Sequence, residues 1–173
     1  GRTTSSGRIG VNNLDGKLPR GEVRHPDLSY DGEKLVFGFC DHEATEGEAR
    51  AFFLYECDTD GSNVRQLTGT EDDPLTGWEN RATVLPEDFD PCYLPDGGIA
   101  FISTRSQTFG RCHGSRYTPT YLAYRYDDDL GIRQLSFGEA NEWDPSVLPN
   151  GRVVFTRWDY INRHDVRFQS LWT

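Results

Sequence analysis

Short apolar runs bounded by turn residues recur along the chain, and they are too short to form helices. Three of them, at residues 35–39, 99–103 and 153–156, are rich in β-branched and aromatic residues. Each follows a turn that contains proline and glycine. Runs of this length and composition predict β-strands.

The apolar runs belong to a repeated unit. The segment before each run reads His-Pro-Asp-Leu-Ser-Tyr-Asp-Gly from residue 25, Asp-Pro-Cys-Tyr-Leu-Pro-Asp-Gly from residue 90, and Asp-Pro-Ser-Val-Leu-Pro-Asn-Gly from residue 144. In the first two units a second apolar run, at 52–58 and 121–127, is followed by Arg-Gln-Leu-Thr or Arg-Gln-Leu-Ser. Each unit therefore predicts four antiparallel strands, A to D, which is the arrangement of a propeller blade.

We predict an all-β fold: a β-propeller fragment of four-stranded antiparallel blades, with two full blades and the start of a third. The expected divisions are a lead-in segment or remnant of a preceding blade, a blade with a long D-to-A connection, a blade with a long B-to-C loop, and a truncated further blade. In that order, the lead-in segment spans residues 1–24, the two full blades span 25–89 and 90–143, and the truncated blade spans 144–173. Because so few blades cannot close a ring, we expect the chain alone to be poorly soluble or oligomeric.

The long connections predict a functional surface. In an antiparallel meander the A-to-B and C-to-D turns emerge at one edge, and the other connections emerge at the opposite edge. Nearly all the extra length lies in the B-to-C loops and the D-to-A connections, at residues 41–50, 105–120 and 159–168 and at 69–89 and 137–143. We therefore expect the long loops to share one face, where binding is concentrated. The alternative interpretation is that the loops vary in length without any role in binding.

Aromatic and charged residues, together with one cysteine, at strand ends and in the long loops make up the candidate binding face. Such side chains commonly anchor binding surfaces. The same residue types at blade ends also lock adjacent blades together through buried hydrogen bonds, so both roles stay open. The candidates are Arg105, Arg111, Cys112, His113, Tyr117, Glu142, Trp143, Arg157, Trp158 and Asp159.

Three histidines, His42, His113 and His164, fall in successive B-to-C loops, each beside a second metal-binding residue type. A metal site shared by the three histidines would require their loops to extend far toward the propeller axis, because equivalent loops of successive blades diverge around that axis. No metal is therefore predicted. A local site at Cys112 and His113 is the alternative to plain solvated loop residues.

Residues 58–63, Asp-Thr-Asp-Gly-Ser-Asn, resemble the start of a calcium loop, but Gly69 stands where the twelfth-position glutamate is expected. An ordinary hairpin turn is the favoured interpretation. No nucleophile motif or acid/base pair stands out, so we predict no catalytic residues.

Four cysteines fit either a reducing or an oxidising compartment. Cys57 is predicted to be a buried thiol outside disulfide reach of Cys40. Cys92 with Cys112 is the one disulfide within a blade that the pattern allows.

The charge excludes some partners. Eighteen basic residues against twenty-eight acidic ones give a net charge of -10, which repels nucleic acid. No apolar run is long enough for membrane insertion.

The blade pattern resembles the WD40-like repeat of periplasmic Tol-type (TolB-like) propellers. Residues 90–172 more specifically resemble the propeller middle domain of the hydrazine synthase alpha subunit and its uncharacterised bacterial relatives, through Phe-Gly-Arg-Cys-His-Gly from residue 109, Asn-Glu-Trp-Asp-Pro-Ser from 141 and Thr-Arg-Trp-Asp-Tyr from 156. The resemblance implies a secreted or periplasmic multidomain protein. The Cys-x-x-Cys-His motif that c-type haem requires is absent, so we expect no cofactor in this fragment, and haem would lie elsewhere in the parent protein.

The leading hypothesis is a non-catalytic propeller segment of a larger secreted or periplasmic protein. Its partners would be other blades and domains of the parent chain, or a separate protein. The alternative is the propeller part of a haem enzyme with Cys112, His113 and Tyr117 near the active centre. A third option, the gating propeller of a serine peptidase, requires a hydrolase domain.

Overall fold

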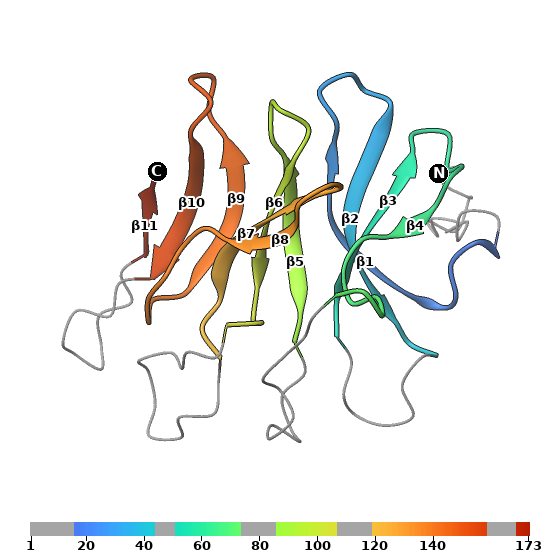
Figure 1. Cartoon of the computed structure of the whole chain (residues 1–173), viewed down its shortest axis with the longest axis horizontal. Coiled ribbons are helices and arrows are strands. Elements are labelled where there is room, and N and C mark those ends of the chain that lie inside the picture. Colours follow the sequence, from blue (N-terminus) through green and yellow to red (C-terminus); the bar gives the residue numbers. More distant parts are fainter. Residues whose placement is uncertain (1–15, 44–50, 74–85, 107–118, 159–168) are drawn as a thin grey trace, which may run out of the picture.

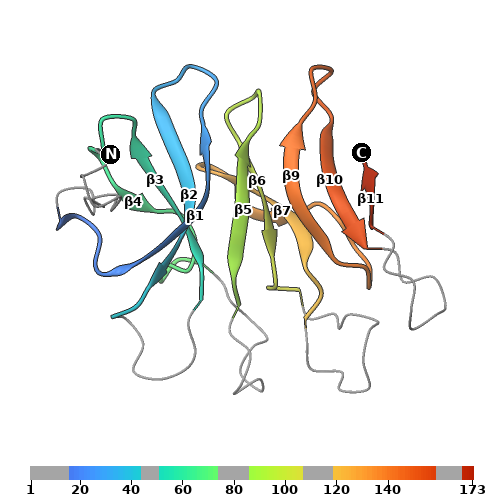
Figure 2. The same ribbon diagram turned by 180° about the vertical axis from the view of Figure 1, so that it is seen from behind.

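The repeated units fold into three antiparallel sheets that stand side by side along the molecule, as Figure 1 shows and the reverse view in Figure 2 repeats. The computed structural model describes residues 16–43, 51–73, 86–106, 119–158 and 169–173. Among these residues there is no α-helix, and hence no helix that is long and apolar enough to cross a membrane. The all-β prediction is confirmed.

Each sheet is a meander in which consecutive strands pair. The first sheet contains β1 Gly21–Leu28, β2 Lys34–Asp41, β3 Phe53–Asp58 and β4 Arg65–Gln66. The second contains β5 Asp88–Tyr93, β6 Ile99–Ser103, β7 Leu122–Asp127 and β8 Gly131–Gln134. The third contains β9 Glu142–Val147, β10 Val153–Trp158 and β11 Gln169–Trp172. Two four-stranded sheets followed by a three-stranded one match the predicted pattern of propeller-blade fragments, and the described strands form no closed barrel.

The first strand of every sheet is interrupted by a β-bulge at a pair of residues, the repeat proline and the residue before it. The strand register shifts between Arg24 and Asp27 in β1 and between Phe89 and Cys92 in β5, and β9 shows the same irregularity opposite Phe155. Proline lacks the N–H that a regular ladder needs, so it fits where the ladder is broken. The sequence placed the repeat start at this pair. The structure shows that each strand begins earlier and runs through it.

The residues before these prolines share an unusual backbone conformation. The φ angles are 47° at His25, 50° at Asp90 and 50° at Asp144. Histidine and aspartate tolerate positive φ better than most side chains. A bulge of this kind turns its side chain away from the regular alternation of the strand.

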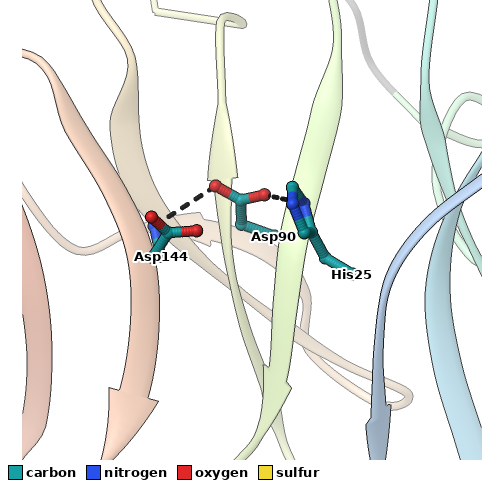
Figure 3. Close-up of side chains that lie close together, drawn as sticks. All are labelled: His25, Asp90 and Asp144. Atoms are coloured by element: carbon teal, nitrogen blue, oxygen red, sulfur yellow. Dashed lines mark hydrogen bonds and ion pairs between the residues drawn. The ribbon is translucent and has the colours of Figure 1, made fainter.

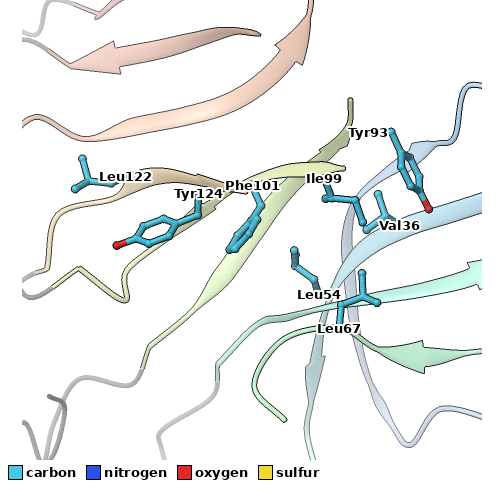
Figure 4. Packing of buried hydrophobic residues seen from close by; sticks show 8 residues of the cluster. All are labelled: Val36, Leu54, Leu67, Tyr93, Ile99, Phe101, Leu122 and Tyr124. Carbon is cyan, nitrogen blue, oxygen red and sulfur yellow. The ribbon is translucent and has the colours of Figure 1, made fainter. Parts of the chain in front are cut away.

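Apolar packing joins neighbouring sheets. Val36 and Leu54 of the first sheet and Leu67, which directly follows β4, form one buried cluster with residues of the second sheet, among them Phe101, which is fully buried (Figure 4). The remaining members of the cluster are Tyr93, Ile99, Leu122 and Tyr124. A smaller cluster around Cys92 and Ala100 packs against Val147 and Val153 of the third sheet.

The tight turns lie at one edge, the hairpin edge. The turns between the first two strands of each sheet end in Gly32, Gly97 and Gly151, whose φ angles of 75°, 89° and 80° favour glycine. Each of these glycine N–H groups donates to the carbonyl three residues earlier. The predicted glycine turns are confirmed.

The opposite edge carries the strand ends that the long connections join, and we call it the long-connection edge. Backbone hydrogen bonds align this edge between sheets, because Asp88 N donates to Phe52 O at 2.8 Å and Glu142 N donates to Tyr121 O at 2.9 Å. In both pairs the start of a first strand meets the residue just before the third strand of the preceding sheet. These strand ends therefore share one edge, as the meander argument predicted.

Candidate functional site

Three side chains from three different sheets meet between the first strands. His25, Asp90 and Asp144 occupy the same position in β1, β5 and β9, each immediately before the proline of its bulge. Figure 3 shows them side by side. One potential metal-binding atom from each residue lies within 4.8 Å of the other two.

Asp90 is the buried centre of this cluster, with 5 % of its side chain exposed, whereas His25 is 54 % exposed and Asp144 is also exposed. Asp90 Oδ2 accepts a hydrogen bond from the backbone N–H of Asp144 at 3.2 Å. Asp90 Oδ1 forms an ion pair with His25 Nδ1, and no other described donor forms a hydrogen bond with it. A buried carboxylate oxygen in that position favours a positive charge beside it.

Burial raises the pKa of Asp90 above its ordinary value, because desolvation penalises the charged form. The Asp144 N–H and the charge and hydrogen bond of His25 lower the pKa of Asp90, and the neighbouring Asp144 carboxylate adds to the upward shift. A cation close to Asp90 would offset the desolvation and stabilise the carboxylate.

A hollow of about 180 Å³ lies farther along the same three strands. Across it, Asp27 Oδ2 accepts a hydrogen bond from Tyr93 N at 2.8 Å, which joins β1 to β5. The lining residues are Asp27, Leu28, Tyr30, Cys92, Tyr93, Ser146 and Val147.

A second polar cluster lies at the long-connection edge and is centred on Arg105. Its guanidinium donates to both carboxylate oxygens of Asp73, at 2.7 and 3.0 Å, and forms an ion pair with Asp88. Only 9 % of the Arg105 side chain is exposed. Burial lowers the pKa of Arg105, but the bonds to the two carboxylates outweigh it and raise the pKa above its ordinary value. Such a buried network is structural, because each nitrogen of the guanidinium donates to a carboxylate of the chain.

The Arg-Gln-Leu-Thr/Ser segments complete a repeated polar lock between sheets. In the first unit Thr68 Oγ1 accepts from Leu54 N at 3.0 Å and its hydroxyl bonds to Asp88. In the second unit Ser136 Oγ accepts from Ala123 N at 2.9 Å and its hydroxyl bonds to Glu142. The buried carboxylate comes from the next sheet in both cases, so each lock joins two sheets.

Five of the predicted face residues lie in the described part of the chain. Arg105 and Glu142 are buried and engaged in the contacts above, which favours the locking role for these two. Trp143 packs edge-on against Tyr121, with ring centroids 6.0 Å apart. The Arg157 guanidinium lies 5.0 Å from the ring centre of Trp172, and Trp158 is half-buried at the end of β10.

The other predicted face residues, Arg111, Cys112, His113, Tyr117 and Asp159, lie outside the described residues, as does His164. The alternative metal site at Cys112 and His113 is therefore untested.

Two local predictions are confirmed. Cys57 is buried and forms no disulfide, and Cys92 is likewise a buried thiol. Residues 58–63 form a hairpin turn in which Asp58 Oδ2 accepts from Ser62 Oγ and Asn63 Nδ2, while Asp60 Oδ1 accepts from Ser62 N.

Sequence reasoning missed the cluster of His25, Asp90 and Asp144. The available signal was the residue before each repeat proline, which is histidine or aspartate in all three units. It also missed Asp73, which stands third in a run of acidic residues and has no local feature that distinguishes it.

No model of a known protein family matches the chain, and no curated protein matches it. The resemblance to Tol-type propellers and to the hydrazine synthase alpha subunit therefore stays a prediction.

Proposed function

We propose that the chain is a non-catalytic binding or scaffold segment of a β-propeller, which interacts through its long-connection edge. The observation that carries the proposal is the division between the two edges. Tight glycine turns close the hairpin edge, while the strand ends joined by the long connections gather at the opposite edge.

The sheets provide a rigid base for such a surface. Repeated locks at Thr68 and Ser136, together with the buried Arg105 network, hold neighbouring sheets in fixed relation at that same edge. Binding loops are most effective when a stable scaffold positions them.

Phe137 is an accessible apolar group at this edge. It follows β8 in the connection to β9, and 76 % of its surface is exposed. Large exposed aromatic side chains frequently anchor protein contacts. The occupant we propose is another domain of the parent protein or a separate protein, in a secreted or periplasmic setting, as the resemblance implies.

Site-specific photo-crosslinking in the intact parent protein tests the proposal. A photoreactive phenylalanine analogue replaces Phe137 in one variant and Tyr30 in the other. Tyr30 is the matched control because it is aromatic, 64 % exposed, and located in the β1–β2 turn at the hairpin edge. We expect crosslinks from position 137, identified by mass spectrometry, and few from position 30. No crosslink from position 137, or equal yields from both positions, would overturn the proposal.

An absorption measurement addresses the non-catalytic part of the proposal. The intact protein is expected to show no Soret band. A Soret band that shifts when substitutions are made at the long-connection edge would replace the proposal with the haem-enzyme alternative.

A further inference from the structure

We infer that His25, Asp90 and Asp144 bind one divalent transition-metal cation, which bridges the first strands of the three sheets. The inference does not depend on the proposed binding function. It rests on the convergence of one imidazole and two carboxylates and on the burial of Asp90, whose Oδ1 meets His25 Nδ1 and no other hydrogen-bond donor among the described residues.

The close approach of His25 and Asp90 requires a proton or a metal ion between the two side chains. A His25 Nδ1 that carries a proton can donate a hydrogen bond to Asp90, and a deprotonated Nδ1 can share a metal ion with it. A metal ion held there would also reach Asp144, which a proton would not.

The spacing of the three groups suits a small cation. In a tetrahedral site with ligand bonds of about 2.1 Å, neighbouring ligand atoms lie about 3.5 Å apart. The three atoms are within 4.8 Å of one another, and His25 is in direct contact with Asp90, so rotation of the exposed His25 and Asp144 side chains would have to open this contact and bring Asp144 closer. One imidazole and two carboxylates are ligands suited to Zn²⁺, Mn²⁺ and related ions.

The burial pattern matches a site that is fixed at its base and open above. Asp90 is buried and held by the Asp144 N–H, so it would provide a preformed anchor. The exposed side chains of His25 and Asp144 leave a path for the ion and positions for water. Because each ligand comes from a different sheet, the bound ion would crosslink all three.

Mn²⁺ is the probe for the test, because the electron paramagnetic resonance signal of the free ion decreases on binding. The 173-residue chain, freed of metal with a chelator, is expected to bind one Mn²⁺. We expect His25→Gln, Asp90→Asn and Asp144→Asn each to weaken binding by about tenfold or more. The matched controls His42→Gln and Asp129→Asn, at a histidine and an exposed aspartate outside the cluster, should bind as the unaltered chain does.

A measurement on the unaltered chain removes the question of whether variants fold. The chain has four histidines, whose ring proton signals in nuclear magnetic resonance spectra can be assigned by single substitution. Mn²⁺ should broaden the His25 signals first. Absence of binding, affinity unchanged in His25→Gln and Asp144→Asn, or preferential broadening at another histidine would overturn the inference.

Discussion

Thr68 and Ser136 perform the same task in successive units: each hydroxyl accepts a backbone N–H from the third strand of its own sheet and bonds to a buried carboxylate of the next sheet. The repeated Thr or Ser is therefore explained by a contact between sheets and not by strand propensity alone. The two locks lie at the same edge, so they set the spacing of neighbouring sheets there.

Removing one hydroxyl should destabilise the chain. Thr68→Val preserves shape but leaves Leu54 N–H and the Asp88 carboxylate each short of a partner in a fully buried site. We expect a loss of about 1–3 kcal/mol in the free energy of unfolding, measured by urea denaturation. Thr59→Val, at an exposed threonine, is the control and should change it by less than about 0.5 kcal/mol. Equal effects of the two substitutions would contradict the lock.

The Arg105 network predicts a larger effect. Arg105→Met keeps much of the side-chain volume but leaves Asp73 and Asp88 buried without their cation. Loss of one partner of a buried ion pair costs about 3–5 kcal/mol, so urea denaturation should show a large loss of stability. Arg152→Met, at an exposed arginine in the β9–β10 turn, should change stability by less than about 0.5 kcal/mol. A stability of Arg105→Met close to that of the control would show that the network is dispensable.

The strands and glycine turns could be predicted because their signals are local. The apolar run at 99–103 and Gly97 specify a strand and its turn within a few residues. The pairing of Arg105 with Asp73 could not be predicted, since it joins residues 32 apart and depends on how one sheet packs on the next. The contact between His25 and Asp90 could not be predicted for the same reason, because only the bulges and the packing of the sheets bring these side chains together.

The ion pair between Arg65 of the first sheet and Asp128 of the second predicts a pH dependence. The Arg65 hydrogen bond lowers the pKa of Asp128 below its ordinary value of 3.8. The stabilisation from a lowered carboxylate pKa is present above the ordinary value and is lost as pH falls through the lowered one. Asp128→Asn should therefore lower the melting temperature at pH 7 by up to about 3 °C, a small effect because the pair is exposed to solvent.

Calorimetry across pH separates this effect from others. The difference in melting temperature between the unaltered chain and Asp128→Asn should be constant from about pH 7 to 5 and should vanish at the lowest pH at which the chain folds. The control Asp129→Asn, at the exposed adjacent residue, should show no such profile. A difference that grows as the solution becomes more acidic would contradict the assigned direction of the shift.

The outer side of β11 predicts self-association of the chain. This strand pairs with β10, and among the described strands none pairs with its other side. Leu171 on β11 is 76 % exposed, and an apolar edge strand is a template for pairing with another chain. We expect light scattering to show an apparent mass that rises with protein concentration. The substitution Leu171→Lys should reduce this apparent mass. Leu130→Lys, at an exposed leucine in the β7–β8 turn, should leave the mass unchanged. A monomer at all concentrations, or equal effects of both lysines, would refute association through this edge.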